Sequence, residues 1–318
     1  MKKVVVDATG GDNLDKIVRG IAQAIASGIS PEDLIIICDV VSAAKLRNLS
    51  ITGPQIIQTE IPVELPKSQR AKLQLLCEKH PIGIGLSLLQ ATDGFFHRQA
   101  KCPQAGAFVS AGSTKKIVGL APHLLSRLRI AGRFKTSAVR PAIAAICPHA
   151  ENCLFADVGA SPGLEPIDYV RLAFLCTAYA IVIFKIERPA VRLLNIGEEN
   201  DVGGQTLIEA NRLLRACPEI NFLGNCQGYD IAKPPTDTNI ILTSAETGNP
   251  CLKLWEADHP DLAQLVGGLP LLGFHGNVII AHGSSSAEKF AKAILAAYQL
   301  ANSDLIPTTI EMLKGKKE

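Results

Sequence analysis

The chain has 318 residues, of which 47% are hydrophobic, so it can bury a large core in one or two α/β domains. Its 32 basic and 30 acidic side chains leave a net charge of only +2, and aromatic residues make up 5%. This balance argues against nucleic acid as a partner, because neither a basic surface nor base-stacking aromatics are enriched.

Short apolar runs alternate with helical patterns, which predicts βαβ units around a mostly parallel sheet. The first expected strand is Val4–Val6, which ends at Asp7. Gly10-Gly11 then turns the chain, and Asp12 is the expected cap of a helix over Asn13–Ser27. Further strands are expected at Leu34–Cys38, Ala107–Val109, Leu154–Asp157, Val191–Leu194, Asn221–Leu223, Asn239–Leu242 and Asn277–Ala281, with helices at Gln205–Ala216 and Ser286–Ala301.

Cysteine usage and hydropathy favour a cytoplasmic protein. The nine cysteines are scattered and odd in number, which is typical of reduced thiols. The cluster from Cys147 through His149 to Cys153 could offer metal ligands, but a second cluster of matching spacing is lacking, so an ordinary loop is favoured. The apolar segment Leu172–Ile186 is shorter than the ~20 residues of a spanning helix, which favours a helix buried in the core or at a subunit interface. The apolar run at the N-terminus is too short for a secretory signal.

No Pro/Gly/Ser-rich linker interrupts the sequence, so residues 1–318 are expected to form a single structural unit. The tail from Ile310, which ends in Lys-Gly-Lys-Lys-Glu, is expected to be frayed.

Segments rich in glycine and small polar residues follow seven of the expected strands. They are Asp7–Asn13, Ser110–Lys116, Asp157–Gly163, Asn195–Gly204, Gly224–Asp230, Thr243–Asn249 and His282–Ser286. Ligands of open parallel sheets bind at the carboxyl ends of the strands, and glycines let backbone amides approach an anion there. One such loop is explained equally well as a strand-to-helix turn, whereas seven favour a shared polar cleft.

A series of motifs runs in order from Lys3 to about Ala301. They are VVVDATGGDN, VSAGST, Arg140-Pro141-Ala142, DVGA, LLNIGEE, NFLGN, TGN with LKLWE, and AHGSS. Their order resembles the phosphate acyltransferase (PlsX) family of bacterial phospholipid synthesis, and LLNIGEE and NFLGN are the most specific of them.

The resemblance implies a Rossmann-like three-layer α/β sandwich with a mostly parallel sheet, related to phosphotransacetylases and isopropylmalate-type dehydrogenases. It implies a cytoplasmic homodimer that transfers an acyl group from acyl carrier protein or acyl-CoA to inorganic phosphate. It also implies an acyltransferase that needs no metal or organic cofactor.

The reaction requires phosphate to be held in line with a thioester carbonyl, and donors to stabilise the oxyanion that forms. The resemblance implies that Asn249 acts at the reaction centre, and His282 is a second candidate that would orient phosphate or carry a proton. A turn-fixing asparagine and a structural histidine are the alternatives. The expected phosphate- and substrate-binding residues are Asp7, Gly10, Gly11, Ser110, Gly112, Ser113, Thr114, Lys115, Gly159, Asn195, Gly197, Glu199, Gly248, Gly283 and Ser284.

Four site loops depart from the family pattern. Ser113-Thr114-Lys115 replaces Asn-Thr-Gly, and Val202 replaces a lysine just before a glycine. Ser244-Ala245-Glu246 replaces Asp-Gly-Phe, and Gly159–Gly163 replaces Gly-Ala-Asn with a following Asp. These changes leave two hypotheses open: an active enzyme with a remodelled pocket, and a catalytically impaired paralogue that serves as a binding or regulatory subunit.

Two further features bear on this choice. Lys115 and Lys116 stand at the start of an expected helix, where they either bring positive charge to an anion or are solvated surface lysines. The family's long helical hairpin after Leu252–Glu256 is missing from the sequence, which argues against membrane docking and a long acyl tunnel. An NAD-dependent dehydrogenase is disfavoured, because Asp7-Ala-Thr-Gly-Gly is not the spaced G-x-G-x-x-G fingerprint.

Overall fold

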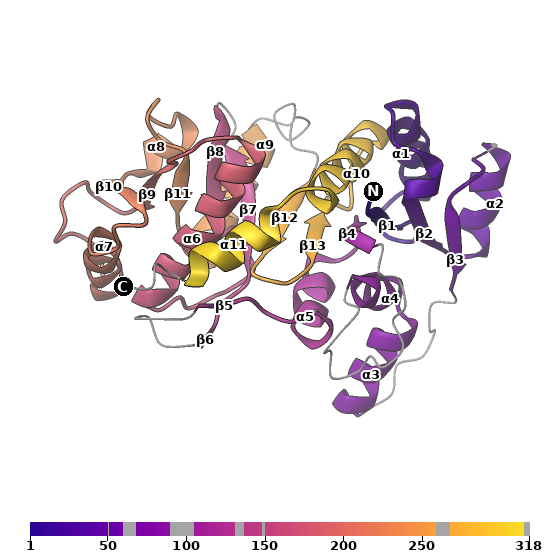
Figure 1. Cartoon of the computed structure of the whole chain (residues 1–318), viewed down its shortest axis with the longest axis horizontal. Coiled ribbons are helices and arrows are strands. Elements are labelled where there is room, and N and C mark those ends of the chain that lie inside the picture. Colours follow the sequence, from indigo (N-terminus) through magenta and orange to yellow (C-terminus); the bar gives the residue numbers. More distant parts are fainter. Residues whose placement is uncertain are drawn as a thin grey trace. The chain divides into compact units, whose positions relative to one another are not determined.

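The computed structural model describes residues 1–49, 51–59, 68–89, 105–130, 137–147, 150–258 and 268–314. The chain divides into two compact units, whose helices and strands are labelled in Figure 1. Unit 1 comprises residues 1–126, 265–270 and 274–302, and unit 2 comprises residues 127–264, 271–273 and 303–318. The expectation that residues 1–318 correspond to one family domain stays a prediction.

Unit 1 is built on a parallel sheet in the order β13-β4-β1-β2-β3. The strands are β1 (Lys3–Asp7), β2 (Leu34–Cys38), β3 (Gln55–Gln58), β4 (Ala105–Ser110) and β13 (Asn277–Ile280). Every residue of β2 is fully buried, as expected of an inner parallel strand with helices over both faces. The register pairs Asp7 with Ser110, so the carboxyl ends of β1 and β4 lie side by side.

The helices of unit 1 come between and after its strands along the chain. They are α1 (Leu14–Ala26), the 3-10 turn η1 (Pro31–Asp33), α2 (Val40–Asn48), α3 (Gln69–Lys79), α4 (Pro81–Leu88), α5 (Thr114–Leu124) and α10 (Ala287–Ala301). The predicted cap of α1 was wrong by one residue, because Asn13 Oδ1 accepts from the Lys16 N–H at 3.2 Å. Asp12 instead donates its backbone N–H to Gly283 O at 2.8 Å.

Unit 2 carries a mixed sheet in the order β10-β9-β11-β8-β7-β12. The strands are β7 (Ala142–Cys147), β8 (Ala150–Ala156), β9 (Ala190–Leu194), β10 (Asn221–Cys226), β11 (Ile240–Leu242) and β12 (Leu269–Leu272, whose last two residues belong to unit 2). Strand β7 runs antiparallel to both β8 and β12, whereas β8, β9, β10 and β11 are parallel. Strands β5 (Arg129–Ile130) and β6 (Ser137–Ala138) form a separate antiparallel pair. The antiparallel hairpin of β7 and β8 was not predicted.

The helices of unit 2 are α6 (Pro166–Ile183), α7 (Gln205–Arg215), α8 (Gly228–Ala232), α9 (Ala245–Asp258) and α11 (Leu305–Lys314). The expected fraying from Ile310 was wrong as far as Lys314, because α11 continues to that residue and packs against α6 (Figure 1). Leu313 on α11 is only 1% exposed, and this packing holds the last turn of α11 in place.

Helix α6 contains the apolar segment predicted from the sequence. Within the described residues, it alone is long and apolar enough to cross a membrane, with a mean hydropathy of 1.5. Its central residues are buried inside the protein, and the core helix of a soluble protein satisfies the same criterion of length and composition. The expectation of a buried helix is confirmed, although the helix begins earlier, at Pro166, where Glu165 and Asp168 form a capping box.

Candidate functional site

The pair Asp7 and Ser110 joins the carboxyl ends of β1 and β4 in unit 1. Ser110 Oγ donates to Asp7 Oδ2 at 2.7 Å and accepts from the Gly112 N–H at 2.9 Å. The other carboxylate oxygen of Asp7 accepts from the Thr9 N–H at 2.9 Å and from the Thr9 hydroxyl at 2.7 Å. Both Asp7 and Ser110 are buried, so they fix the two loops that follow their strands.

Three glycine loops of unit 1 meet at this edge of the sheet. A Cβ atom on Gly10 would lie 2.6 Å from Gly112 N, which only glycine tolerates. Gly11 has a φ of +87°, and a Cβ there would lie 3.2 Å from Gly283 O. The loops after β1, β4 and β13 therefore come into contact, which places the predicted residues Gly10, Gly11, Gly112 and Gly283 together.

The turn after β4 contains the N-terminal cap of helix α5. Ser113 caps α5, its side chain accepting from the Lys116 N–H at 3.4 Å, and Ser113, Thr114 and Lys115 are all exposed. Lys116 differs from Lys115, because its Nζ lies 3.1 Å from His80 Nε2.

His80 was not among the predicted site residues. Its Nδ1 accepts from the Ile82 N–H at 3.2 Å and so caps α4. Burial and the neighbouring Lys116 ammonium lower the pKa of His80, whereas Asp7 acts in the opposite direction. The only local signal was a histidine directly before Pro81 and an apolar run, which indicates a helix start; its closeness to Lys116 comes from packing.

His282 lies in the loop after β13 and is exposed. Its Nδ1 lies 2.7 Å from Ser284 Oγ and accepts from the Ser284 N–H at 3.3 Å. A neutral ring with Nδ1 as acceptor carries its proton on Nε2, so Nε2 is available as a donor. Gly283, between the two, contacts the loop after β1 as described above.

In unit 2, the carboxylate of Asp157 organises the loop that follows β8. It accepts four backbone N–H groups, from Ile143 at 3.0 Å, Gly159 at 2.9 Å, Ala160 at 2.9 Å and Ser161 at 2.7 Å. Burial raises the pKa of Asp157, and the four N–H donors act in the opposite direction. Asp157 was predicted as a strand end and as the first residue of the loop Asp157–Gly163, but not as the group that holds the main chain of Gly159 in place.

Helix α9 presses Gly248 and Asn249 against this loop. A Cβ on Gly248 would lie 2.0 Å from Asp157 O, and Asn249 Nδ2 donates to Val158 O at 3.1 Å. The expected loop over Thr243–Asn249 was wrong in its second half, because α9 begins at Ala245. The predicted residues Gly159, Gly248 and Asn249 are therefore neighbours, and the amide of Asn249 links helix to loop.

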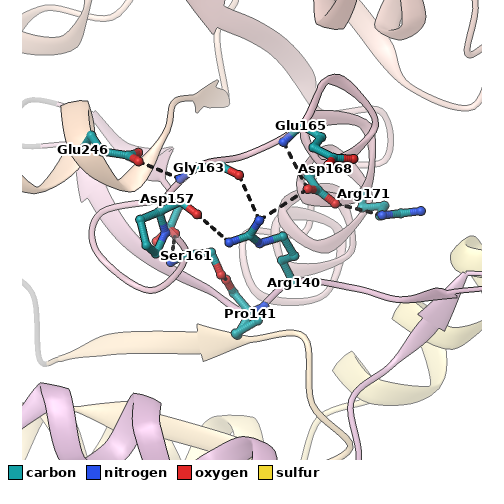
Figure 2. A network of polar contacts seen from close by, with 10 residues as sticks. Arg140, Pro141, Asp157, Ser161, Gly163, Glu165, Asp168, Arg171 and Glu246 are labelled. Atoms are coloured by element: carbon teal, nitrogen blue, oxygen red, sulfur yellow. Dashed lines mark hydrogen bonds and ion pairs between the residues drawn. The ribbon is translucent and has the colours of Figure 1, made fainter. Parts of the chain in front are cut away.

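Figure 2 shows how the two altered loops of unit 2 are bonded to each other. Glu246 Oε1 accepts from the Gly163 N–H at 2.6 Å, and Arg140 donates to the carbonyls of Gly163, at 2.9 Å, and Pro162. The backbone N–H groups of Glu246 and Gly163 lower the pKa of the Glu246 carboxyl. Charged side chains thus hold both the N–H and the carbonyl of Gly163.

The same network continues into the start of α6 (Figure 2). Asp168 lies 2.8 Å from Arg171 Nη1 and 3.9 Å from Arg140 Nη1, and is 6% exposed. Ser161 Oγ donates to Pro141 O at 2.6 Å. These contacts anchor the loop after β8 to a buried helix.

The loop after β9 holds three more predicted residues. Asn195 Nδ2 donates to Val202 O at 3.1 Å, closing the loop onto itself. A Cβ on Gly197 would lie 2.7 Å from Glu199 Oε2, and Glu199 is exposed while its carbonyl accepts from Asn225 Nδ2 at 2.6 Å. Val202 closes this loop with its backbone carbonyl, and its side chain packs near Gly197, where a Cβ would lie 3.3 Å from Val202 Cγ2.

The cysteine cluster lies on the hairpin of β7 and β8. Cys147 Sγ and Cys153 Sγ are 3.3 Å apart and buried, while His149 lies outside the described residues. In the part of the chain that the structure describes, no group of three His, Cys, Asp or Glu side chains could hold a metal ion. Residues 259–267, where the family hairpin would be inserted, are also outside the described residues.

Comparisons with known proteins decide the family. The model of a family described as "Fatty acid synthesis protein" matches residues 95–266. A phosphate acyltransferase of Heliobacterium modesticaldum is 30% identical over 358 residues, covering 99% of both chains. The chain belongs to the phosphate acyltransferase family. A second such relative, from Salinibacter ruber, is 27% identical to this family member and covers 95% of both chains.

Solved structures confirm the predicted fold of this family member. A phosphotransacetylase from Streptococcus pyogenes superimposes with a TM-score of 0.61, at 18% identity and with 94% of each chain covered. At that identity the likeness concerns the fold alone, which is the three-layer α/β sandwich with a mostly parallel sheet.

Proposed function

We propose that this phosphate acyltransferase family member transfers an acyl group from an acyl thioester to inorganic phosphate, giving an acyl phosphate for phospholipid synthesis. The observation that carries the proposal is the match to proteins named phosphate acyltransferase over 95–99% of the chain. In the reaction, a phosphate oxygen attacks the thioester carbonyl carbon. The carbon–sulfur bond then breaks, and the thiolate leaves and takes up a proton.

Acyl carrier protein is the proposed donor, with acyl-CoA as the second candidate. We further propose a homodimer in the cytoplasm, without a metal or organic cofactor, without nucleic acid as a partner and without docking to a membrane. These assignments rest on the family and on the sequence features described above.

For unit 1, we propose that the glycine loops present backbone and side-chain donors to phosphate. Support comes from the close contact of Gly10 with Gly112 and from the buried Asp7–Ser110 pair, which keep the loops in one geometry. Donors that are already oriented stabilise developing charge without reorganisation. His282, with Nε2 as a donor, is the proposed group that orients phosphate or carries a proton.

For unit 2, we propose that Asn249 donates to a substrate oxygen. An amide nitrogen carries two N–H groups, and Val158 O accepts one of them at 3.1 Å. The second N–H belongs to an exposed side chain that α9 and the Asp157 loop hold firmly. Replacing Asn249 with alanine should lower kcat by about 10²-fold or more, the effect typical of losing one oxyanion donor.

A catalytically impaired paralogue is the alternative, and two observations favour it. Val202 brings no charge where the family has lysine, and its backbone only closes the loop onto Asn195. Glu246 places a carboxylate on the Gly163 N–H, which removes that donor from any anionic substrate.

Hydroxylamine trapping tests the proposal. The purified protein is incubated with phosphate and with acyl carrier protein thioesters or acyl-CoA of several chain lengths, and acyl hydroxamate is measured. We expect hydroxamate that depends on both phosphate and protein. No product from any donor, beside an active family member as a control, would leave only the impaired paralogue. Activity that appears only in a Val202→Lys variant would identify the lost charge as the cause.

A further inference from the structure

His80 and Lys116 bring two hydrogen-bond donors to one point at the site edge of unit 1. His80 Nε2 and Lys116 Nζ are 3.1 Å apart, although one residue precedes α4 and the other lies in the first turn of α5. The contact is adjacent to the turn after β4, since a Cβ on Gly112 would lie 3.0 Å from Ile82 Cδ1 in the first turn of α4.

The tautomer of His80 follows from its role as a helix cap. Ile82 is 1% exposed, so its backbone N–H cannot turn to water and needs a protein acceptor. That acceptor is His80 Nδ1, at 3.2 Å. A neutral imidazole has one acceptor nitrogen and one N–H, so Nε2 must carry the proton. Nε2 then faces the Lys116 ammonium as a second donor.

Two donors side by side favour an acceptor that both can reach. Lys116 is exposed, and within the described residues no carboxylate forms an ion pair with it. Asp7, the carboxylate whose charge acts on His80, is buried and already accepts from Thr9 and Ser110. An oxygen of a phosphate group would accept from both donors, and charge-assisted bonds of this kind are strong.

We infer that His80 and Lys116 form a two-donor clamp for a phosphate group beside the turn after β4. The inference rests on the proposed function, which requires such a group. Its source is either inorganic phosphate or the phosphate of a phosphopantetheine arm on the thioester donor. Lys116 contributes charge, while His80 contributes a neutral N–H.

Matched variants separate the clamp from a structural role. Lys116→Gln removes the charge, and Lys72→Gln does the same on an exposed lysine of α3, outside the glycine loops. His80→Asn keeps a short acceptor that can cap α4 but loses the Nε2 donor. His80→Gln keeps a donor at the reach of Nε2 but loses the cap. Far-UV circular dichroism confirms that each variant is folded.

The first arm measures binding of inorganic phosphate alone by calorimetry. We expect Lys116→Gln and His80→Asn each to weaken binding about tenfold, the loss typical of one charge-assisted hydrogen bond. Lys72→Gln and His80→Gln should stay within about threefold of the parent. The second arm measures KM for a phosphopantetheine thioester and for a thioester that lacks phosphate. If Lys116→Gln and His80→Asn bind phosphate as the parent does, but their KM rises about tenfold only for the phosphopantetheine thioester, the clamp binds the phosphate of the donor.

The clamp is wrong if Lys116→Gln behaves like Lys72→Gln in both arms, or if His80→Gln is defective while His80→Asn is normal. The clamp is also wrong if the parent protein does not bind inorganic phosphate and has the same KM for thioesters with and without a phosphate group. Failure of the proposed function looks different. If the protein binds phosphate and the variants weaken this binding as expected, but no acyl phosphate forms, the clamp is supported and the proposed transfer reaction is refuted.

Discussion

Two glycines inside helices should respond in opposite ways to the same substitution. Gly248 lies in α9 against the loop after β8, where a Cβ would meet Asp157 O at 2.0 Å. Gly119 lies in α5, is exposed, and would place its Cβ in open space. Alanine is the better helix former at both positions by about 1 kcal/mol. Only tertiary contact distinguishes the two sites.

The magnitude for Gly248→Ala follows from what must move. Real Cβ atoms stay beyond 3.0 Å from such a neighbour, so helix and loop must separate by about 1 Å. Overpacking of this kind costs about 1–3 kcal/mol. The loop resists, because Asp157 holds it through four backbone N–H groups, and losing one hydrogen bond to a charged group costs about 1.5–3 kcal/mol. After the gain in helix propensity, we expect Gly248→Ala to lower the free energy of unfolding by about 1.5–5 kcal/mol.

Urea unfolding measures both variants. Trp255, the single tryptophan of the chain, lies in α9 with its ring 5.2 Å from that of Phe155, so its fluorescence follows the transition of unit 2. Far-UV circular dichroism follows the helices of both units. Gly119→Ala should raise stability by up to about 1 kcal/mol. A Gly248→Ala protein as stable as its parent would refute the close approach of α9 to the Asp157 loop.

Three further predictions concern single groups. Because the pKa of His80 is lowered in the folded state, the unfolded chain binds more protons below about pH 6.5, and the free energy of unfolding should fall as pH drops through that range. His80→Asn should flatten this dependence in urea titrations, and an unchanged slope would contradict it. Glu246→Ala should speed hydrogen exchange at the Gly163 amide, whereas Glu246→Gln, which keeps an acceptor, should not; equal exchange in both would exclude the bond. Among the described cysteines, Cys251 alone is partly exposed, so a thiol reagent with peptide mapping should modify it before the seven buried ones.

Local patterns in the sequence were sufficient for most strands and for the loops that follow them. Strands β1 and β2 were placed correctly because apolar runs bounded by polar turns are typical of inner parallel strands. The glycines after β1 and β4 were expected to let backbone amides approach an anion, whereas the close contact of Gly10 with Gly112 was not predicted. Errors of one residue, as at the Asn13 cap, arose because neighbouring Asp and Asn side chains are equally good caps.

Tertiary structure alone decided which groups meet. Glu246 and Gly163 are 83 positions apart, and Lys116 and His80 are 36 apart, so neither pair leaves a periodic or spacing signal. The helical start of α9 also placed Gly248 where the sequence indicated only a loop. The sequence by itself determined the family, the mostly parallel fold and the polar loops, because these depend on local composition and order. The partners of each side chain depend on how distant elements pack, and only the folded chain decides them.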